Sequence, residues 1–327
     1  MQILAGDIGG TKTTLAFVEA SANRAIEVLC RSSYASPDHA SLDDILDRFL
    51  QRHAVRPDAA AFGVAGPVRD GRCVTTNLPW VIDTGSLRKR LGTDRVWLIN
   101  DLEANAWGIQ ILENKDFFTL NPGSPHASGN RCIISAGTGL GEAGLFWNGK
   151  HHIPFASEGG HAAFSPTNER EIALLNFLRR QHDHVGWEQV LSGNGLVNIH
   201  QFLLQQAARP IPDWLREETN NGDPAAAISA AARQDPNGIC ATALRMFTRL
   251  YGVEAGNHAL KIMATGGVYL GGGIAPKILE ELREPEFLEG FFHKGRMETL
   301  MRDMPVKIIL EPDTALLGAA LYARQRG

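Results

Sequence analysis

Two stretches of glycine and threonine, each lying between short apolar segments, limit more than any other feature what this chain of 327 residues can fold into. The first is Gly6-Asp7-Ile8-Gly9-Gly10-Thr11, between the apolar segments 3–5 and 13–18. The second is Gly137-Thr138-Gly139-Leu140-Gly141, between two segments of the same kind, 131–136 and 143–147. Apolar, β-branched runs bounded by glycine predict strands joined by tight turns. The plan of strand, turn and strand therefore occurs twice, which indicates two related lobes.

Strands and helices alternate along the rest of the chain, which predicts the α/β class. Ser41 precedes a segment with apolar residues on one helical face, so we expect it to cap a helix that ends at His53. Asp313 is expected to cap the terminal helix in the same way, and Pro276 to open a helix. The other strands are expected at residues 27–31, 59–65, 72–76, 96–99, 268–270 and 306–310, and the helices at 84–91, 102–112, 168–182, 195–208, 224–233, 236–261 and 314–324.

Charge and composition exclude several classes of function. The formal net charge is −4 and the pI is about 6.3, which argues against a broad surface for nucleic acid or for an anionic membrane. No apolar run has the length of a membrane span, and the sequence does not open on a basic leader. The four cysteines are widely spread and form no CxxC pair, so we expect reduced thiols in a cytoplasmic protein and no structural zinc site.

Glycine-rich turns suit the binding of phosphate groups. They let the backbone curl tightly and direct successive N–H groups at phosphate oxygens. In the first stretch Thr11 adds a hydroxyl donor, and Asp7 is placed to hold a hydrated Mg²⁺. A third stretch, Gly271-Gly272-Gly273-Ile274-Ala275-Pro276, allows a flat ligand to approach the backbone beside a helix N-terminus. None of the three has the spacing of a Walker A loop or of a Rossmann turn, and taken singly each is equally typical of an ordinary turn.

Three glycine turns of this type, in this order, resemble those of the actin-like ATPase fold, a ribonuclease H-like architecture shared by the hexokinase superfamily. Other segments are similar to the bacterial glucokinase family over essentially the whole chain. These are Leu98-Ile99-Asn100-Asp101-Leu102-Glu103-Ala104, Ser157-Glu158-Gly159-Gly160-His161 and Trp187-Glu188-Gln189-Val190-Leu191-Ser192-Gly193. The resemblance implies a small α/β domain of residues 1–108 plus 305–327, a large one of residues 109–304, and a cleft between them.

The resemblance also implies the activity and its residues. The reaction is the transfer of phosphate from ATP, with Mg²⁺, to the 6-hydroxyl of glucose, by a homodimer. Asp101 is the implied catalytic base, and the implied sugar-binding residues are Asn100, Asp101, Glu158, His161 and Glu188. Asn77 lies near the sugar pocket in the matched pattern. The implied ATP-binding residues are Asp7, Gly9, Gly10, Thr11, Gly137, Thr138, Gly271, Gly272, Gly273 and Ile274.

The residue chemistry agrees with these roles, because a hexose presents a ring of hydroxyls that amides, carboxylates and imidazoles can fix. Taken alone, without the resemblance, Asp101 is more typical of a helix N-cap at the end of a strand than of a catalytic base. Lys12 departs from the family pattern, which often has Asn at this position. Two other functions stay open at this point: a kinase for another hexose such as mannose, fructose or glucosamine, and a sugar sensor without catalysis.

Overall fold

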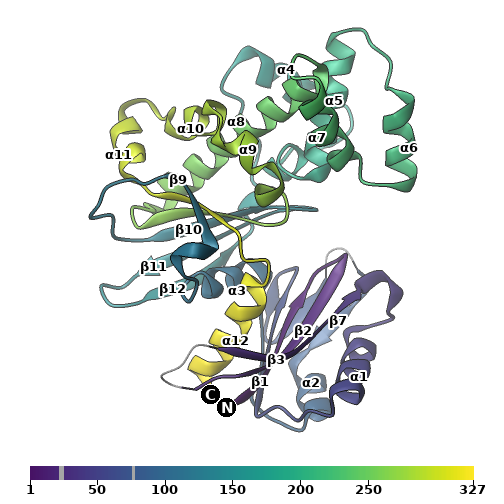
Figure 1. Cartoon of the computed structure of the whole chain (residues 1–327), viewed down its shortest axis with the longest axis vertical. Coiled ribbons are helices and arrows are strands. Elements are labelled where there is room, and N and C mark those ends of the chain that lie inside the picture. Colours follow the sequence, from purple (N-terminus) through teal and green to yellow (C-terminus); the bar gives the residue numbers. More distant parts are fainter. Residues whose placement is uncertain (22–25, 76–77) are drawn as a thin grey trace. The chain divides into compact units, whose positions relative to one another are not determined.

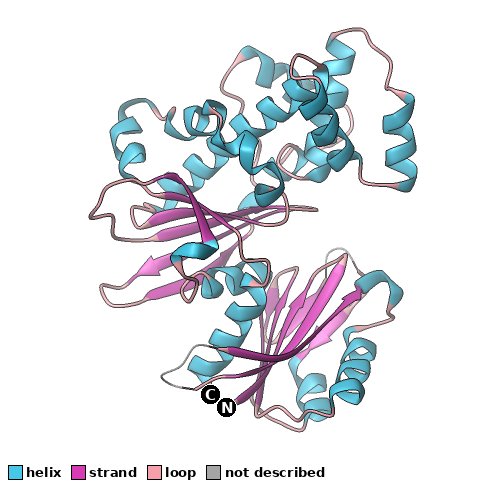
Figure 2. Cartoon of the chain, viewed as in Figure 1, coloured by secondary structure: helices cyan, strands magenta, loops and turns pink. Residues whose placement is uncertain are grey.

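The computed structural model describes residues 1–21, 26–75 and 78–327, and the described residues form two compact units. Unit 1 comprises Met1–Asp116, Pro154–Ala156 and Glu311–Gly327, and unit 2 comprises Phe117–Ile153 and Ser157–Leu310. Figure 1 follows the chain from purple to yellow, and Figure 2 shows that each unit combines a β-sheet with α-helices. The α/β class predicted from the sequence is therefore confirmed.

Unit 1 is built on a sheet with the strand order β3-β2-β1-β4-β8. β1 pairs with β2 in an antiparallel hairpin and with β4 in parallel, and β4 pairs with β8 in parallel. A smaller antiparallel sheet has the order β5-β6-β7. The strands are β1 (Gln2–Ile8), β2 (Lys12–Glu19), β3 (Glu27–Ala35), β4 (Ala59–Val64), β5 (Val68–Arg69), β6 (Arg72–Val74), β7 (Val81–Asp83) and β8 (Val96–Asn100).

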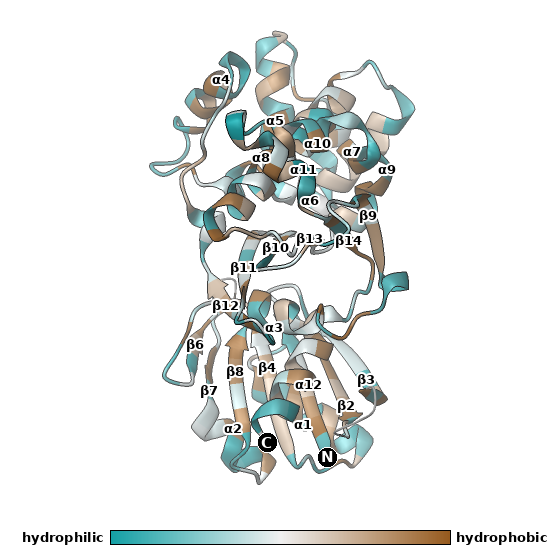
Figure 3. Cartoon of the chain, turned by 90° about the vertical axis from the view of Figure 1, so that its left-hand side faces the viewer, coloured by the Kyte–Doolittle hydropathy of each residue, from teal (hydrophilic) through white to brown (hydrophobic). Residues whose placement is uncertain are grey.

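Helices cover both faces of the larger sheet of unit 1. Successive residues of a strand point to opposite faces, and β1 has apolar side chains on both. On one face Leu4 belongs to a cluster with Phe49 of α1. On the other face Ile3 and Ala5 pack with Ala319 of α12. Figure 3 shows the apolar residues of β4 and β8 in brown. The helical segments are η1 (Ser36–Asp38), α1 (Leu42–His53), α2 (Thr84–Leu91), α3 (Asp101–Gly108), η2 (Asn114–Asp116) and α12 (Thr314–Arg326).

Unit 2 carries a sheet with the strand order β12-β11-β10-β13-β14-β9, and its long helices lie on one side of that sheet (Figure 2). The strands are β9 (Phe117–Asn121), β10 (Arg131–Ala136), β11 (Leu140–Trp147), β12 (His152–Ser157), β13 (Gly267–Gly271) and β14 (Val306–Ile309). The helical segments are η3 (Gly159–His161), α4 (Glu169–Leu178), η4 (Trp187–Gln189), α5 (Gly193–Gln206), α6 (Asp213–Asn221), α7 (Pro224–Gln234), α8 (Ile239–Ile262), η5 (Ala275–Ile278), α9 (Leu279–Arg283), α10 (Pro285–Phe292), η6 (Gly295–Met297) and α11 (Glu298–Asp303).

The two sheets share one plan, as the sequence predicts. In unit 1 the hairpin β1–β2 closes at Ile8 opposite Thr13, and in unit 2 the hairpin β10–β11 closes at Ala136 opposite Leu140. Each hairpin has a parallel strand on its other side, β4 next to β1 and β13 next to β10. Both glycine turns therefore leave the end of a central strand.

Several element boundaries differ from the prediction. β1 continues through Ile8, so Asp7 lies in the strand and the first turn comprises only residues 9–11. β11 begins at Leu140 rather than at residue 143, which shortens the second turn likewise. Pro276 lies in η5, and the following α-helix begins at Leu279. The sequence prediction also missed short or weakly periodic elements, namely β5, β7, β9, β12, α6, α10 and α11.

Local chemistry at two helix ends explains their bounds. Ser41 caps α1 as predicted, since its side chain accepts from the N–H of Asp44 at 3.4 Å. α3 ends at Gly108 rather than at residue 112. A Cβ atom at Gly108 would overlap with the carbonyl group of Thr314, so the last residue of α3 must be glycine where it packs against α12. In the part of the chain that the structure describes, no helix combines the length and the apolar character that a membrane crossing requires.

The crossing of α3 and α12 gives a test of the packing in unit 1. A Cβ atom at Gly318 would overlap with the carbonyl oxygen of Ala104, which belongs to rigid helical backbone. We expect Gly318→Ala to lower the free energy of unfolding by about 1–3 kcal/mol, because an overpacked backbone contact must shift. Urea denaturation measures this change. Gly85→Ala in α2 is the control: it meets only the Asp83 side chain and should be neutral or stabilising, and an equal loss there would contradict the argument.

Candidate functional site

The first glycine turn is held by a serine that the sequence analysis missed. The Gly9 N–H donates to the carbonyl of Lys12 at 3.0 Å and closes the turn. Ser36 then fixes it from the side: its N–H donates to the carbonyl of Thr11 at 3.0 Å, and its hydroxyl donates to the carbonyl of Gly9 at 2.8 Å. Thr11 itself is exposed. The turn is thus rigid before any ligand binds, with the Thr11 hydroxyl accessible.

Asp7 lies on β1, two residues before this turn, opposite Thr14 of β2 and Gly63 of β4. Burial raises the pKa of the Asp7 carboxyl to about 6, the positive charge of Lys12 opposes that rise, and the carboxylate of Asp313 adds to it. Lys12 therefore acts on Asp7 electrostatically. Asp7 and Asp313 form an acidic pair whose repulsion a divalent cation would relieve.

Asp313 does not have the predicted role of a side-chain cap. It occupies the N-cap position of α12, but its side chain accepts no bond from that helix. Its carboxylate instead accepts from Nη2 of Arg31 on β3 at 2.6 Å. The prediction was wrong because a charged partner distant in sequence competes for the carboxylate and provides a charge-assisted hydrogen bond.

Asn100 and Asp101 stand where β8 passes into α3. Asn100 is the N-cap: its Oδ1 accepts from the N–H of Leu102 at 2.9 Å and of Glu103 at 3.2 Å. Its Nδ2 donates to the carbonyl of Gly66 at 3.3 Å. The alternative that Asp101 is the N-cap is therefore wrong. Asp101 is the first residue of α3, half-buried, and its Oδ1 accepts from the N–H of Leu102 at 3.0 Å.

The second glycine turn is joined to Glu188. The Gly137 N–H donates to the carbonyl of Gly139 at 2.8 Å, and the Gly193 N–H donates to the carbonyl of Gly137 at 2.9 Å. Oε2 of Glu188 accepts from the N–H of Leu140 at 3.0 Å. A Cβ atom at Gly139 would overlap with this carboxylate, so a larger residue there would displace the Glu188 side chain. Thr138 is exposed at the tip of the turn.

Ser192 fixes Glu188 from the other direction. Its hydroxyl donates to the carbonyl of Glu188 at 2.8 Å and accepts from the N–H of Gly195 at 3.0 Å, which caps α5. The segment Trp187-Glu188-Gln189 thus forms η4 between a glycine turn and a helix N-terminus. Its backbone and side chains have little freedom, as a binding carboxylate requires.

The third glycine stretch packs on the end of β10. The Ile274 N–H donates to the carbonyl of Ala136 at 3.2 Å, and Gly272 has φ +79° with no space for a Cβ atom against that same carbonyl. Gly272 and Gly273 are exposed. Because Ser135 of β10 pairs with Gly271 of β13, the second and third stretches leave the same edge of one sheet. The structure therefore brings the predicted residues Gly137, Thr138 and Gly271 to Ile274 together within unit 2.

Glu158 and His161 are exposed on either side of the short turn η3. The His161 N–H donates to the carbonyl of Glu158 at 3.0 Å, and Nε2 of His184 hydrogen-bonds the carbonyl of His161 at 2.8 Å. The Trp187 N–H donates to the carbonyl of Ala162 at 3.0 Å, which ties η3 to η4 and so to Glu188. Asp7, Gly9, Gly10, Thr11, Asn100 and Asp101 belong to unit 1, and Asn77 lies outside the described residues.

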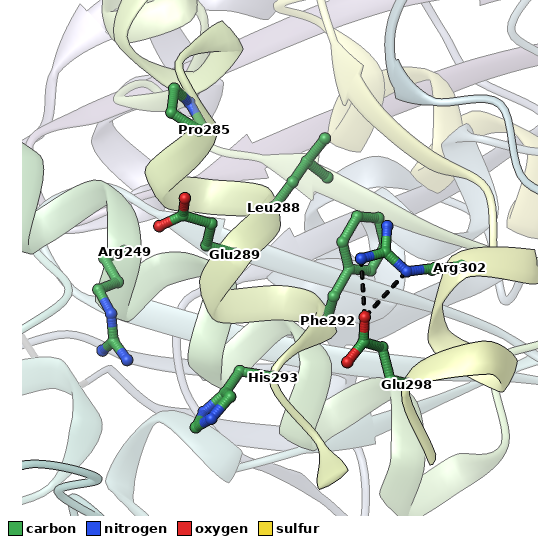
Figure 4. Close-up of a pocket in the computed structure, with 8 residues that line it drawn as sticks. All are labelled: Arg249, Pro285, Leu288, Glu289, Phe292, His293, Glu298 and Arg302. Carbon is green, nitrogen blue, oxygen red and sulfur yellow. Dashed lines mark hydrogen bonds and ion pairs between the residues drawn. The ribbon is translucent and has the colours of Figure 1, made fainter. Parts of the chain in front are cut away.

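A pocket of about 520 Å³ lies on unit 2 away from all of these residues, between α8, α10 and α11 (Figure 4). Both arginines that line it are already paired. Arg302 donates to Oε1 of Glu298 at 2.7 Å and stacks over Phe292 at 4.4 Å, and Arg249 pairs with the buried Glu171. The pocket therefore offers no unpaired arginine with which to bind an anionic ligand.

Comparison with known proteins identifies the family. The sequence model of the family described as Glucokinase matches residues 4–326. A protein of Nostoc punctiforme named glucokinase is 42% identical to this chain over 98% of each. A crystal structure of glucokinase from an Antarctic psychrotroph superposes with a TM-score of 0.84 and 28% identity over 99% of each chain.

A more distant structure shares the fold. It is a ROK family glucokinase from Streptomyces griseus in complex with glucose and AMPPNP, with a TM-score of 0.67 and 22% identity, and the match covers 99% of this chain and 100% of that one. These neighbours confirm the actin-like ATPase fold that the glycine turns predicted. The match to the family model spans nearly the whole chain, and the chain belongs to the Glucokinase family.

Proposed function

We propose that this protein transfers the γ-phosphate of ATP to the 6-hydroxyl of glucose, which yields glucose 6-phosphate and ADP. The observation that carries the proposal is the match to the Glucokinase family over residues 4–326. The position of Asp101 supports it, because Asn100 caps α3 and Asp101 is not needed for that purpose.

Glucose is bound in this proposal by Asn100, Asp101, Glu158, His161 and Glu188. Support comes from the turns that hold them: Glu188 is fixed through Oε2 by the Leu140 N–H, and η3 is tied to η4. A carboxylate has about four acceptor positions, so one backbone bond leaves others for sugar hydroxyls. Each hydrogen bond to a charged group contributes about 1.5–3 kcal/mol.

ATP is bound by the glycine turns. We assign the phosphates to Gly9, Gly10, Thr11, Gly137 and Thr138, and the adenosine to the stretch from Gly271 to Ile274. Exposed threonine hydroxyls and backbone N–H groups at these turns are the donors that phosphate oxygens prefer. The fold neighbour in complex with glucose and AMPPNP supports ATP as the phosphate donor.

Mg²⁺ fits the donor set of unit 1. Asp7, with Asp313 nearby, supplies hard carboxylate oxygens. No cluster of three or more metal-binding side chains occurs among residues 1–21, 26–75 and 78–327. Such a cluster is not required, because Mg²⁺ bound together with a nucleotide needs only one or two carboxylates. Bound there through water, the ion would neutralise charge on the phosphate chain.

Asp101 acts as the catalytic base. Its carboxylate accepts the proton of the glucose 6-hydroxyl as that oxygen bonds to the γ-phosphorus and the bond from phosphorus to the ADP oxygen breaks. Phosphoryl transfer depends mainly on positioning and on charge stabilisation, and a proton acceptor contributes about 10²–10⁴-fold. We further propose a homodimer in the cytoplasm, on the basis of family resemblance.

Replacement of Asp101 tests the proposed base. Asp101→Asn should lower kcat for glucose-dependent ADP production by about 10²–10⁴-fold, while glucose binding falls far less, because the amide keeps the hydrogen bonds but accepts no proton. A coupled assay of ADP and calorimetry with glucose measure the two effects. Glu103→Gln, also in the first turn of α3, is the matched control and should keep near-normal turnover.

Two outcomes would contradict the proposal. Asp101→Asn with full turnover would exclude Asp101 as base. A wild-type protein that binds sugar but forms no ADP with glucose, mannose, fructose or glucosamine would exclude a hexose kinase.

Replacement of Asp7 should change stability and activity in opposite directions. The pKa of Asp7 is raised from 3.8 to about 6, so the folded state loses stability as pH rises through that window. Asp7→Asn removes the buried charge. At pH 7.5, without ATP or Mg²⁺, it should raise the free energy of unfolding by up to about 3 kcal/mol, and by less at pH 5. Turnover should fall by at least about 100-fold.

Urea denaturation at both pH values, with the ADP assay beside it, checks this expectation. Asp58→Asn is the control: Asp58 accepts a backbone bond from Gln2 in an exposed loop and lies away from the turns. If Asp7→Asn proves less stable than wild type at pH 7.5, the carboxylate is stabilising and the argument is wrong.

A further inference from the structure

A polar stripe runs along the buried face of α8. Tyr251, Glu254 and His258 are spaced three and four residues apart, so they lie on one side of the helix. Their exposed fractions are 0%, 0% and 3%. The hydroxyl of Tyr251 donates to the carbonyl of Ile134 at 3.2 Å, which ties α8 to β10 near the second glycine turn. The other two residues face Glu142 of β11.

Glu142 lies directly beneath the turn that carries Glu158 and His161. Its side chain is 1% exposed, and a Cβ atom at Gly159 would overlap with its Oε2. Gly160 packs as closely on the carbonyl of Leu140, the first residue of β11. The start of β11 and the Glu142 carboxyl thus form the surface on which η3 rests.

The carboxyl group of Glu142 faces two hydrogen-bond acceptors. Nε2 of His258 is 3.1 Å from the carbonyl of Ala143, which can only accept, so the proton of the neutral ring is on Nε2. Burial lowers the pKa of His258 and keeps the ring neutral. Nδ1 is then an acceptor, 3.3 Å from Oε2 of Glu142. Oε1 of Glu142 and Oε1 of Glu254 are both buried without a hydrogen-bond partner, and the two carboxyl groups interact.

A proton on Glu142 resolves this conflict, because a carboxylic acid donates one hydrogen bond either to His258 or to Glu254. Burial, and then the charge of Glu254, raise the pKa of Glu142 to about 8, which agrees with a protonated carboxyl group. Burial also raises the pKa of Glu254, and the positive charge of Lys261, 3.5 Å from its Oε1, opposes that rise. The other titratable groups that act on this pair are Cys132, Tyr251 and Lys294.

We propose that Glu142 works as a protonated acid and is a positioning residue for η3, so that it sets the geometry of Glu158 and His161 for glucose. The inference rests on the proposed function for its kinetic readout only. Glu142 does not touch the sugar: it acts through Gly159. Loss of its proton would leave two carboxylates in contact in the core beneath the turn, which displaces the turn.

Two variants at position 142 separate this role from general stability. Glu142→Gln keeps the shape and an N–H donor but cannot ionise, so KM for glucose should stay within about twofold of wild type at pH 7. Above pH 8, KM for glucose should rise in wild type and stay flat in Glu142→Gln. Glu142→Leu removes the donor and should raise KM for glucose by about tenfold to hundredfold, with KM for ATP within about twofold.

Hydrogen exchange tests whether Glu142 positions η3, and this measurement does not depend on enzyme activity. In the ligand-free protein, amides 159–162 should exchange at least about tenfold faster in Glu142→Leu than in Glu142→Gln, while amides of β1 and β2 are unchanged. Absence of ADP formation in wild type would defeat the proposed function, yet this comparison would still decide the role of Glu142. Equal exchange in the two variants, or an equal rise of KM for glucose in both, overturns the proposal. If Glu142→Leu does not fold, the pH dependence of KM in Glu142→Gln decides it alone.

Discussion

The parallel pairing of β10 with β13 is the contact on which the candidate site of unit 2 depends. It sets Ser135 beside Gly271, so the second and third glycine stretches leave one sheet edge as neighbours. The carbonyl of Ala136 then accepts from the Ile274 N–H at 3.2 Å, which is possible only because Gly272 has no side chain. Ligands of α/β proteins commonly bind at the carboxyl ends of parallel strands, where such backbone groups converge. The relative position of the two glycine stretches therefore follows from the strand register.

α8 places polar groups in a core that apolar side chains would stabilise more. Tyr251 packs against Phe247 and Phe287, and Glu254 and His258 are buried on the same helix. A buried polar group costs free energy unless it is hydrogen-bonded, and a buried charge costs more. Two of these groups, however, restrain a strand: Tyr251 bonds β10 and His258 bonds β11. The two restrained strands flank the second glycine turn, and β11 supports η3. The buried polar groups therefore cost stability but hold the turns of the predicted site in place.

Local chemistry explains which parts were predictable from sequence. Glycine turns and the Ser41 cap depend on neighbours within a few residues, and both were predicted correctly. Asn100 and Asp101 are equally good caps by composition, and only the end of β8 decides that Asn100 takes the role. Asp313 was misassigned because its partner Arg31 lies 282 residues away. Glu142 resembled any charged residue in a strand, since its acceptors come from α8, more than a hundred residues later in the chain.

Asp7 and Glu142 show how surroundings give similar carboxyl groups different roles. Burial raises the pKa of both. Asp7 is partly exposed at a strand end, with Lys12 as a compensating charge, so its anion is accessible to a hydrated cation. Glu142 is enclosed, and the groups that face its carboxyl are themselves acceptors. An incoming cation would favour ionisation of the first, whereas the geometry around the second favours the protonated acid. In the roles that we propose, the same type of group therefore binds a hydrated cation at the turn of unit 1 and donates a hydrogen bond in the core of unit 2.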